Sequence, residues 1–102
     1  MYNRLMKDTY GIIIDLDDEM LKKLYPDSSF QNAYNEIRLF LEEMGFIWKS
    51  HSFYYGNGKT SVQTILICRE MSKKFKWLYP STKKIEMIRI SENNDLMEAI
   101  KQ

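Results

Sequence analysis

Cysteine and long hydrophobic runs are what this chain of 102 residues has least of. Its one cysteine, Cys68, excludes a disulfide within the chain. No stretch approaches the roughly 18 apolar residues of a membrane-spanning helix, and residues 1–9 lack the hydrophobic segment of a secretory signal. These absences predict a protein of a reducing, aqueous compartment, and we expect it in the cytoplasm without membrane contact.

Proline, glycine and an excess of either charge are also scarce. There are two prolines and four glycines, whereas 44% of the residues are hydrophobic and 14% aromatic, as in a folded domain. At this length we expect one domain at residues 10–102 after a short extension at residues 1–9. The 15 basic and 14 acidic side chains nearly balance, which excludes a surface that is basic all over. A nucleic acid would have to bind a local patch.

The most informative stretch is residues 11–17, GIIIDLD, an apolar run that ends in acid. Three consecutive isoleucines favour a strand, and the unbroken run predicts burial on both faces, as in the centre of a sheet. Because side chains alternate along a strand, Asp15 falls at its end on the same face as Ile13. Asp15 and Asp17 either cap the turn or helix that follows or belong to a chemical site.

Apolar residues at helical spacing predict two long helices, over residues 30–44 and 60–75. The first would begin with an N-cap at residues 27–29 and end at Gly45. The inner stripe of the second would hold or adjoin Val62, Ile65, Leu66 and Arg69. Short helical segments are expected at residues 20–25, led into by residues 17–19 and stopped by Pro26, and at residues 96–102, the latter capped by residues 93–95.

The strands complete the pattern. The aromatic stretch at residues 46–55 predicts a hairpin that Gly-Asn-Gly stops at residues 56–58, and residues 84–90 predict a last strand. Strand, helix, strand, strand, helix, strand, with both helices on one face of one sheet, is the ferredoxin-like βαββαβ arrangement of the α+β class. Because its sheet edges remain free to pair with a second copy, we expect a homodimer.

Four stretches of the chain together carry a family resemblance. They are the opening strand YGIIIDLD, the helix with its Gly-Phe exit NAYNEIRLFLEEMGFIW, the Ser-x-Tyr strand in SFYYGN, and EMSKKFKWLYPSTKKIEMIRI. From residue 10 to about residue 100 the chain resembles the virulence-associated protein D (VapD) family of small bacterial toxins, which are related to the CRISPR-adaptation endonuclease subunits.

This resemblance implies a ferredoxin-like homodimer and an endoribonuclease, often encoded in toxin–antitoxin modules. RNA is then the expected substrate and a cognate antitoxin an expected partner. Carried over residue by residue, the acid of the first strand falls on Asp15, and the serine and aromatic of the second hairpin strand fall on Ser52 and Tyr54. Two features depart from the family. Ser50-His51 stands where the family often has Gln-Gly, and reversed charges at Lys84 and Glu86 carry over no phosphate contact.

Two routes to RNA cleavage fit these residues. Without metal, a base takes the 2′-OH proton, an acid protonates the leaving 5′-oxygen and a cation stabilises the phosphorane. His51, Lys49 and Tyr54 could supply these parts. Alternatively, two Asp15 carboxylates of a dimer could hold Mg²⁺. His51 is the one histidine, the side-chain type that carries protons near neutral pH, but it also suits a plain surface turn.

Basic residues interleaved with aromatics follow the second long helix. Lys73, Lys74 and Lys76, next to Trp77 and Tyr79, could grip and stack single-stranded RNA, and with Lys49 they are the expected RNA-binding residues. The alternative is that the lysines finish a helix and Trp77 fills the core. An alternative function is a dimer of the same fold that binds RNA or a protein without catalysis.

Overall fold

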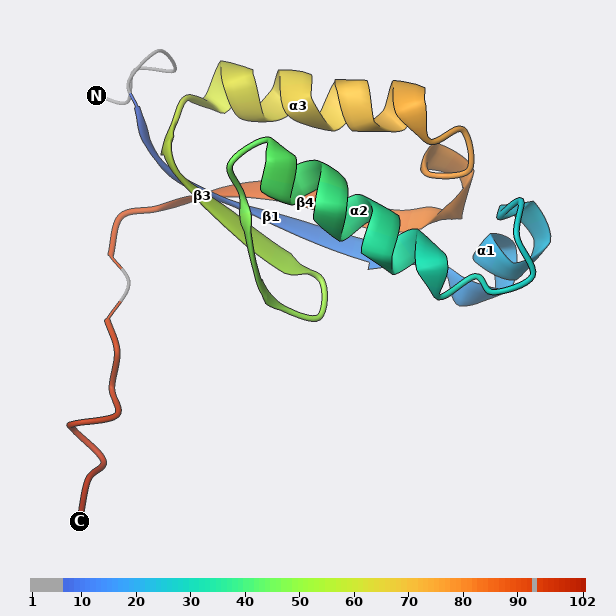
Figure 1. Cartoon of the computed structure of the whole chain (residues 1–102). Coiled ribbons are helices and arrows are strands. Elements are labelled where there is room, and N and C mark those ends of the chain that lie inside the picture. Colours follow the sequence, from blue (N-terminus) through green and yellow to red (C-terminus); the bar gives the residue numbers. More distant parts are fainter. Residues whose placement is uncertain (1–6, 93) are drawn as a thin grey trace.

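One four-stranded sheet organises the protein, whose computed structural model describes residues 7–92 and 94–102. Its strands are β1 (Asp8–Leu16), β2 (Ile47–Ser50), β3 (Phe53–Lys59) and β4 (Thr82–Ile90). They lie in the order β2-β3-β1-β4, and every neighbouring pair is antiparallel. The isoleucine-rich strand β1 is therefore central, as predicted (Figure 1).

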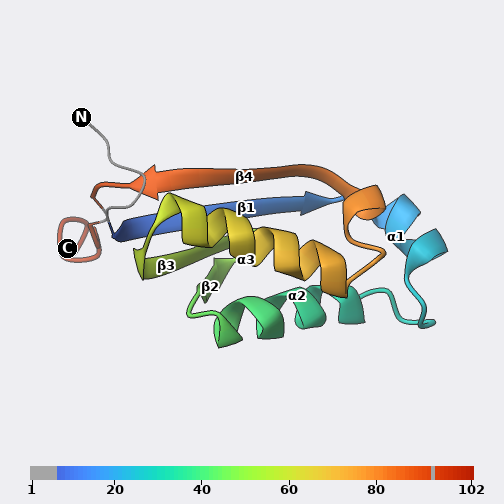
Figure 2. The ribbon, with the colours of Figure 1, turned by 90° about the horizontal axis from the view of Figure 1, so that it is seen from above.

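Both long helices lie on the same face of this sheet (Figures 1 and 2). They are α2 (Asn32–Glu43) and α3 (Ser61–Lys74), while the short α1 (Asp18–Leu24) follows β1 and the 3₁₀ turn η1 (Tyr79–Ser81) precedes β4. This is an α+β fold whose element order and strand order are compatible with the ferredoxin-like arrangement. No described helix has the length and apolar content to cross a membrane.

The core fills the space between these helices and one face of the sheet. Ile12 and Ile14 of β1 and Ile37 of α2 are buried there. Trp77 is only 7% exposed, stacks on Phe75 with ring centroids 5.1 Å apart, and meets Tyr25 edge-on. Of the two roles considered for Trp77, the one in the core is therefore confirmed, and its ring is not free to stack on RNA.

The other face of the sheet is covered by no described element, and we call it the open face. Burial of β1 on both sides is thus a wrong prediction, since Ile13 is only half-buried and Asp15 is exposed. Gly11 lets the Phe53 ring reach across β1, because a Cβ at Gly11 would lie 2.6 Å from that ring and 3.0 Å from the Ile88 side chain. Strand register adds further side chains to the open face, namely Ile47, Lys49, Tyr55, Lys84 and Glu86.

Two predicted boundaries are wrong. The N-cap position of α2 is Gln31, which makes no capping bond, because a turn in which the Asn32 N–H donates to the Ser29 carbonyl (3.1 Å) precedes the helix. Gly56 does not stop β3 either, which continues to Lys59. A Cβ at Gly56 would lie 2.9 Å from the Phe46 ring, so this glycine makes room for a core ring inside the strand.

The face that α3 buries also differs from the prediction. Ser61, Thr64 and Met71 are buried, whereas Ile65 and Leu66 are about half exposed. Thr64 donates its hydroxyl to the Thr60 carbonyl (3.0 Å), so a polar residue can face the core without losing a hydrogen bond. Cys68 lies half-buried against the core, and this burial raises the pKa of its thiol to about 11.

The predicted C-terminal helix is absent from the described residues 94–102, which form only turns. Asp95 accepts a hydrogen bond from the Met97 N–H (2.9 Å), but Leu96, Met97 and Ile100 all remain exposed. A segment this short needs packing to hold a helix, and here it runs away from the sheet (Figure 1). Of the other predicted features, Asn93 and residues 1–6 lie outside the described part of the chain.

Candidate active site

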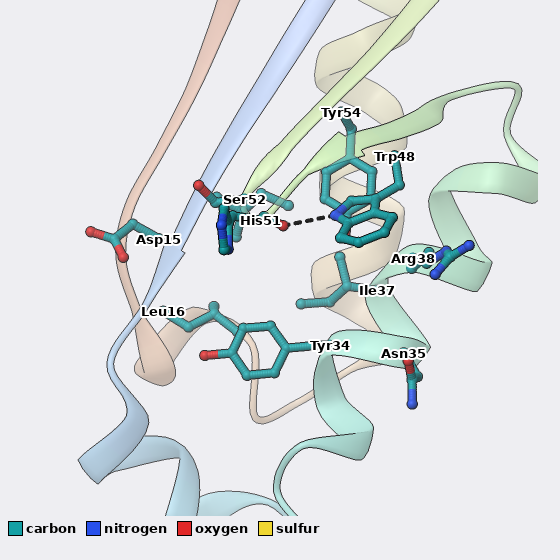
Figure 3. A pocket seen from close by; sticks show the side chains of 11 residues that line it. Asp15, Leu16, Tyr34, Asn35, Ile37, Arg38, Trp48, His51, Ser52 and Tyr54 are labelled. Atoms are coloured by element: carbon teal, nitrogen blue, oxygen red, sulfur yellow. Dashed lines mark hydrogen bonds between the residues drawn. The ribbon is translucent and has the colours of Figure 1, made fainter.

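A cavity of about 490 Å³ lies where β1 ends, between α2 and the β2–β3 hairpin (Figure 3). Four of its lining residues are Asp15, His51, Ser52 and Tyr54, the four predicted catalytic residues, whereas Lys49, the predicted cation, does not line it. They come from the end of one strand and from the hairpin beside it. The remaining lining residues are Ile14, Leu16, Tyr34, Asn35, Ile37, Arg38 and Trp48.

The two acids after the isoleucine run have different positions. Asp17 is the N-cap of α1, and its carboxylate accepts hydrogen bonds from the N–H groups of Glu19 (3.0 Å) and Met20 (3.2 Å). Asp15 is exposed at the rim of the cavity, and its carboxylate is turned to the open face, away from the Trp48 and Tyr54 rings (Figure 3). Within residues 7–92 and 94–102, no hydrogen bond or ion pair holds its carboxylate. The capping role therefore belongs to Asp17, and Asp15 is available to a ligand.

His51 sits in the β2–β3 turn with a φ of +39°. Its carbonyl accepts the indole N–H of Trp48 (2.9 Å), which ties the turn to β2. A positive φ is strained for most side chains, although histidine adopts it more readily than β-branched residues do. Glycine, which the resemblance to the family implies at this position, would adopt this backbone conformation without strain. The turn is thus stabilised through the His51 carbonyl and not through the imidazole.

We expect His51→Gly to unfold with a free energy about 0.5–1 kcal/mol higher than His51→Ala, because only glycine adopts the positive φ without steric cost. Chemical denaturation of both variants measures this difference. Both remove the imidazole, so they should lose the same fraction of any RNA-cleaving activity. If His51→Gly instead keeps more cleavage activity than His51→Ala, in proportion to its higher stability, then His51 is only a turn residue.

Tyr54 is buried at the back of the cavity. Burial raises its pKa to about 12, against a lowering by the Arg38 charge. The phenol therefore stays protonated at neutral pH and can donate a hydrogen bond, but it cannot serve as a base. Tyr34 donates its hydroxyl to the Asp18 carboxylate. Burial, that hydrogen bond and the charges of Asp18 and Asp15 raise the pKa of Tyr34 above its ordinary value.

The α2 side of the cavity, which includes Arg38, was not among the sites predicted from the sequence. The Nε–H of Arg38 donates to Glu42 (2.7 Å), and its guanidinium lies 4.7 Å from the centre of the Trp48 ring. The strand register is irregular between Trp48 and Ser50, and this shift pairs Trp48 with Tyr54, which puts both rings on the helix side of the sheet. Regular pairing across a tight turn at residues 51–52 would instead have placed Trp48 opposite Tyr55 on the open face, so the sequence pattern carries no signal for Trp48.

The predicted RNA-binding lysines do not line this cavity. Lys49 lies on the open face, over the Tyr55 ring at 5.6 Å. Lys73 pairs with Glu70 (3.3 Å) in the last turn of α3, and Lys74 lies 5.7 Å from the Phe75 ring centre. Two of the three lysines at residues 73–76 thus complete a helix, in agreement with the structural alternative.

The charges at residues 84 and 86 belong to the open face. Lys84 pairs with Glu86 (2.9 Å), and this hydrogen bond, with the charges of Glu86 and Asp15, raises the pKa of Lys84. Lys84 also lies opposite Asp15 in the strand register. Lys84 and Glu86, whose charges are reversed relative to the family pattern that the resemblance implies, therefore lie near Asp15 and neutralise each other.

Asp15 is the one carboxylate among the cavity-lining residues. In the described part of the chain, no group of three or more His, Cys, Asp and Glu side chains converges as metal ligands do. Mg²⁺ is commonly held by one or two carboxylates together with waters and phosphates. A Mg²⁺ site would thus combine Asp15 with RNA or with the same residue of a second copy.

The fold and the cavity define a small α+β protein with a site suited to a nucleotide, since aromatic rings there adjoin a carboxylate, an imidazole and a guanidinium. No family model matches the chain.

The chain is 37% identical to Endoribonuclease VapD 2 of Riemerella anatipestifer, over 89% of this chain and 98% of that protein. Two Helicobacter pylori proteins, Endoribonuclease VapD homolog and Endoribonuclease VapD, are 36% and 30% identical, each over 90% of this chain and over 96% and 98% of their own lengths. The chain belongs to the VapD family.

Proposed function

We propose that this protein is an endoribonuclease that cuts RNA at the cavity beside Asp15. Family membership supports the activity, because the relatives that this chain matches over nearly their whole length are named endoribonucleases. The observation that carries the position is the exposed Asp15 carboxylate, free of bonds within the described residues, at the rim of a cavity that also holds His51 and Tyr54. We further propose that it acts in the cytoplasm as the toxin of a toxin–antitoxin module.

Each polar group of the cavity has a chemical task in this proposal. Asp15 would bind Mg²⁺ in the route with metal; in the alternative route without metal, Asp15 and His51 are the groups that can move protons to and from the ribose 2′-OH and the leaving 5′-oxygen. Tyr54, protonated at neutral pH, donates a hydrogen bond to a phosphate oxygen. The Arg38 Nε–H is engaged by Glu42, which leaves its other N–H groups to stabilise negative charge.

We propose a homodimer that forms through the open face. That face presents Phe53 and Ile88 as a continuous apolar surface across Gly11, with exposed Ile47 beside them. The C-terminal segment adds three exposed apolar side chains to be covered, Leu96, Met97 and Ile100. Such surfaces are normally covered by a partner. A second copy would bring its own Asp15 to the same face, and the two carboxylates would share a Mg²⁺ ion.

End-labelled RNA incubated with the purified protein tests this function. We expect internal cuts that EDTA prevents and added Mg²⁺ restores. The reason is that the proposed Mg²⁺ ion, held by two Asp15 carboxylates, would be required for cleavage, and EDTA would remove it. Cuts that persist in EDTA and leave 2′,3′-cyclic phosphate ends would refute the metal proposal and favour His51 and Asp15 acting alone. RNA retained on a filter without any product, and released by salt, would identify a binding protein and not an enzyme.

A further inference from the structure

The two tryptophans of the chain have opposite environments. Trp77 is closed into the core, as described above, whereas Trp48 is 41% exposed and lines the cavity. Its indole is nevertheless held in one orientation, since the N–H donates to the His51 carbonyl (2.9 Å) and Arg38 lies over the ring (4.7 Å). A large ring that is both accessible and fixed is prepared for stacking, because little side-chain entropy remains to be lost.

Arg38 and Trp48 also form a wall between two hollows. On one side is the 490 Å³ cavity that ends at Asp15. On the other is a shallower hollow of about 360 Å³, which Glu42, Gly45, Phe46 and Ile47 line together with the same pair. A chain of nucleotides that passed from one hollow to the other would cross the indole and guanidinium surfaces. The Arg38 side chain is 47% exposed, so it can reach a passing phosphate.

The lining of the cavity suits an unpaired base better than a lone phosphate. The rings of Tyr34 and Tyr54 and the side chain of Ile37 line the same cavity as Trp48 (Figure 3). Aromatic side chains bind bases by their faces. A base that remains paired in a duplex cannot enter such a site, because its faces are stacked and its edge is occupied.

We propose that Trp48 and Arg38 form a subsite for an unpaired base next to the bond that is cut, so that the protein selects single-stranded RNA. This inference rests on the proposed endoribonuclease function and names its substrate class. Trp48 provides the stacking surface, Arg38 binds the adjoining phosphate, and Asp15 lies at the far rim where the chain would be cut. The pair is thus a specificity determinant and not a part of the core.

A 2′-O-methyl oligoribonucleotide in buffer with EDTA tests the subsite by fluorescence anisotropy, because neither its 2′-oxygen nor a Mg²⁺-bound water can then cut it. We expect the single strand to bind more tightly than its duplex and Trp48→Ala to weaken single-strand binding about 10-fold. Trp48→Phe should restore binding to within about 3-fold of wild type, since it keeps a ring but loses the N–H bond to His51. Leu39→Ala is the matched control, because Leu39 is 62% exposed on the same helix as Arg38 and does not line either hollow.

Three results would overturn the inference. Wild-type protein that does not bind the single strand removes it outright. Trp48→Ala that binds as tightly as Leu39→Ala shows that the ring is not used. Trp48→Phe that fails as badly as Trp48→Ala shows that the N–H bond to the turn, and not stacking, was lost. Cleavage assays distinguish failure of the subsite from failure of the proposed endoribonuclease function. Normal RNA cleavage by Trp48→Ala refutes the subsite alone. Single-strand binding that depends on Trp48, without any cleavage by the wild-type protein, refutes the enzyme alone.

Discussion

Asp15→Asn is expected to slow RNA cleavage by at least about 100-fold, because a positioned proton-transfer or metal-binding carboxylate contributes this much or more. Its free energy of unfolding should stay within about 0.5 kcal/mol of wild type. The reason is that Asp15 is exposed and, in the part of the chain that is described, its carboxylate holds no hydrogen bond or ion pair. Initial rates on labelled RNA and urea denaturation measure the two quantities.

Asp17 supplies the matched control two residues away. Asp17→Ala removes the cap that binds the N–H groups of Glu19 and Met20 and should lower the free energy of unfolding by about 1 kcal/mol. Its cleavage rate should remain near wild type at temperatures where it is folded. Asp17→Ala should thus lose stability and keep activity, whereas Asp15→Asn should keep stability and lose activity. An Asp15→Asn protein that cuts RNA at the wild-type rate would show that the carboxylate has no part in catalysis.

The elements could be predicted because their signals are local. Three isoleucines at residues 12–14, a polar break at residues 49–52 and apolar spacing in α2 each depend on near neighbours. The errors occur where a distant residue decides. Gly56 is typical of a turn until the Phe46 ring is known to need its space. Thr64 is typical of a solvent face until α3 packs on the sheet, which buries this residue.

The candidate site shows the same division. Asp15, Ser52 and Tyr54 were found from the sequence because motif positions carry them, and the structure places all three on one cavity. Arg38 was missed because its i,i+4 pairing with Glu42 is the usual pattern of a solvated helix surface. Only the docking of α2 beside the hairpin shows that this arginine faces Trp48. The helix contribution to a site between two elements cannot be deduced from either element alone.

Ile88→Glu is expected to separate the proposed dimer into folded monomers. Ile88 is 38% exposed on the open face and contacts the position of Gly11 beside Phe53. A charge buried in that apolar surface costs several kcal/mol, so the dissociation constant should rise by at least about 100-fold. Sedimentation equilibrium over a range of concentrations measures it. Leu39→Glu, on the exposed side of α2, should leave the dimer unchanged. A dimer that survives Ile88→Glu would mean that another surface joins the copies.

The same pair of copies can be tested for joint use of Asp15. Wild-type protein equilibrated with an about ninefold excess of Asp15→Asn would be almost entirely in mixed dimers. If a Mg²⁺ ion needs both carboxylates, the cleavage rate per wild-type chain should fall to about one tenth, because only that fraction of wild-type chains still pairs with another. A rate per wild-type chain that does not change would show that each Asp15 works in its own cavity, with His51 as its neighbour. The Ile88→Glu monomer should agree with that result, since it would lose cleavage in the first case and retain it in the second.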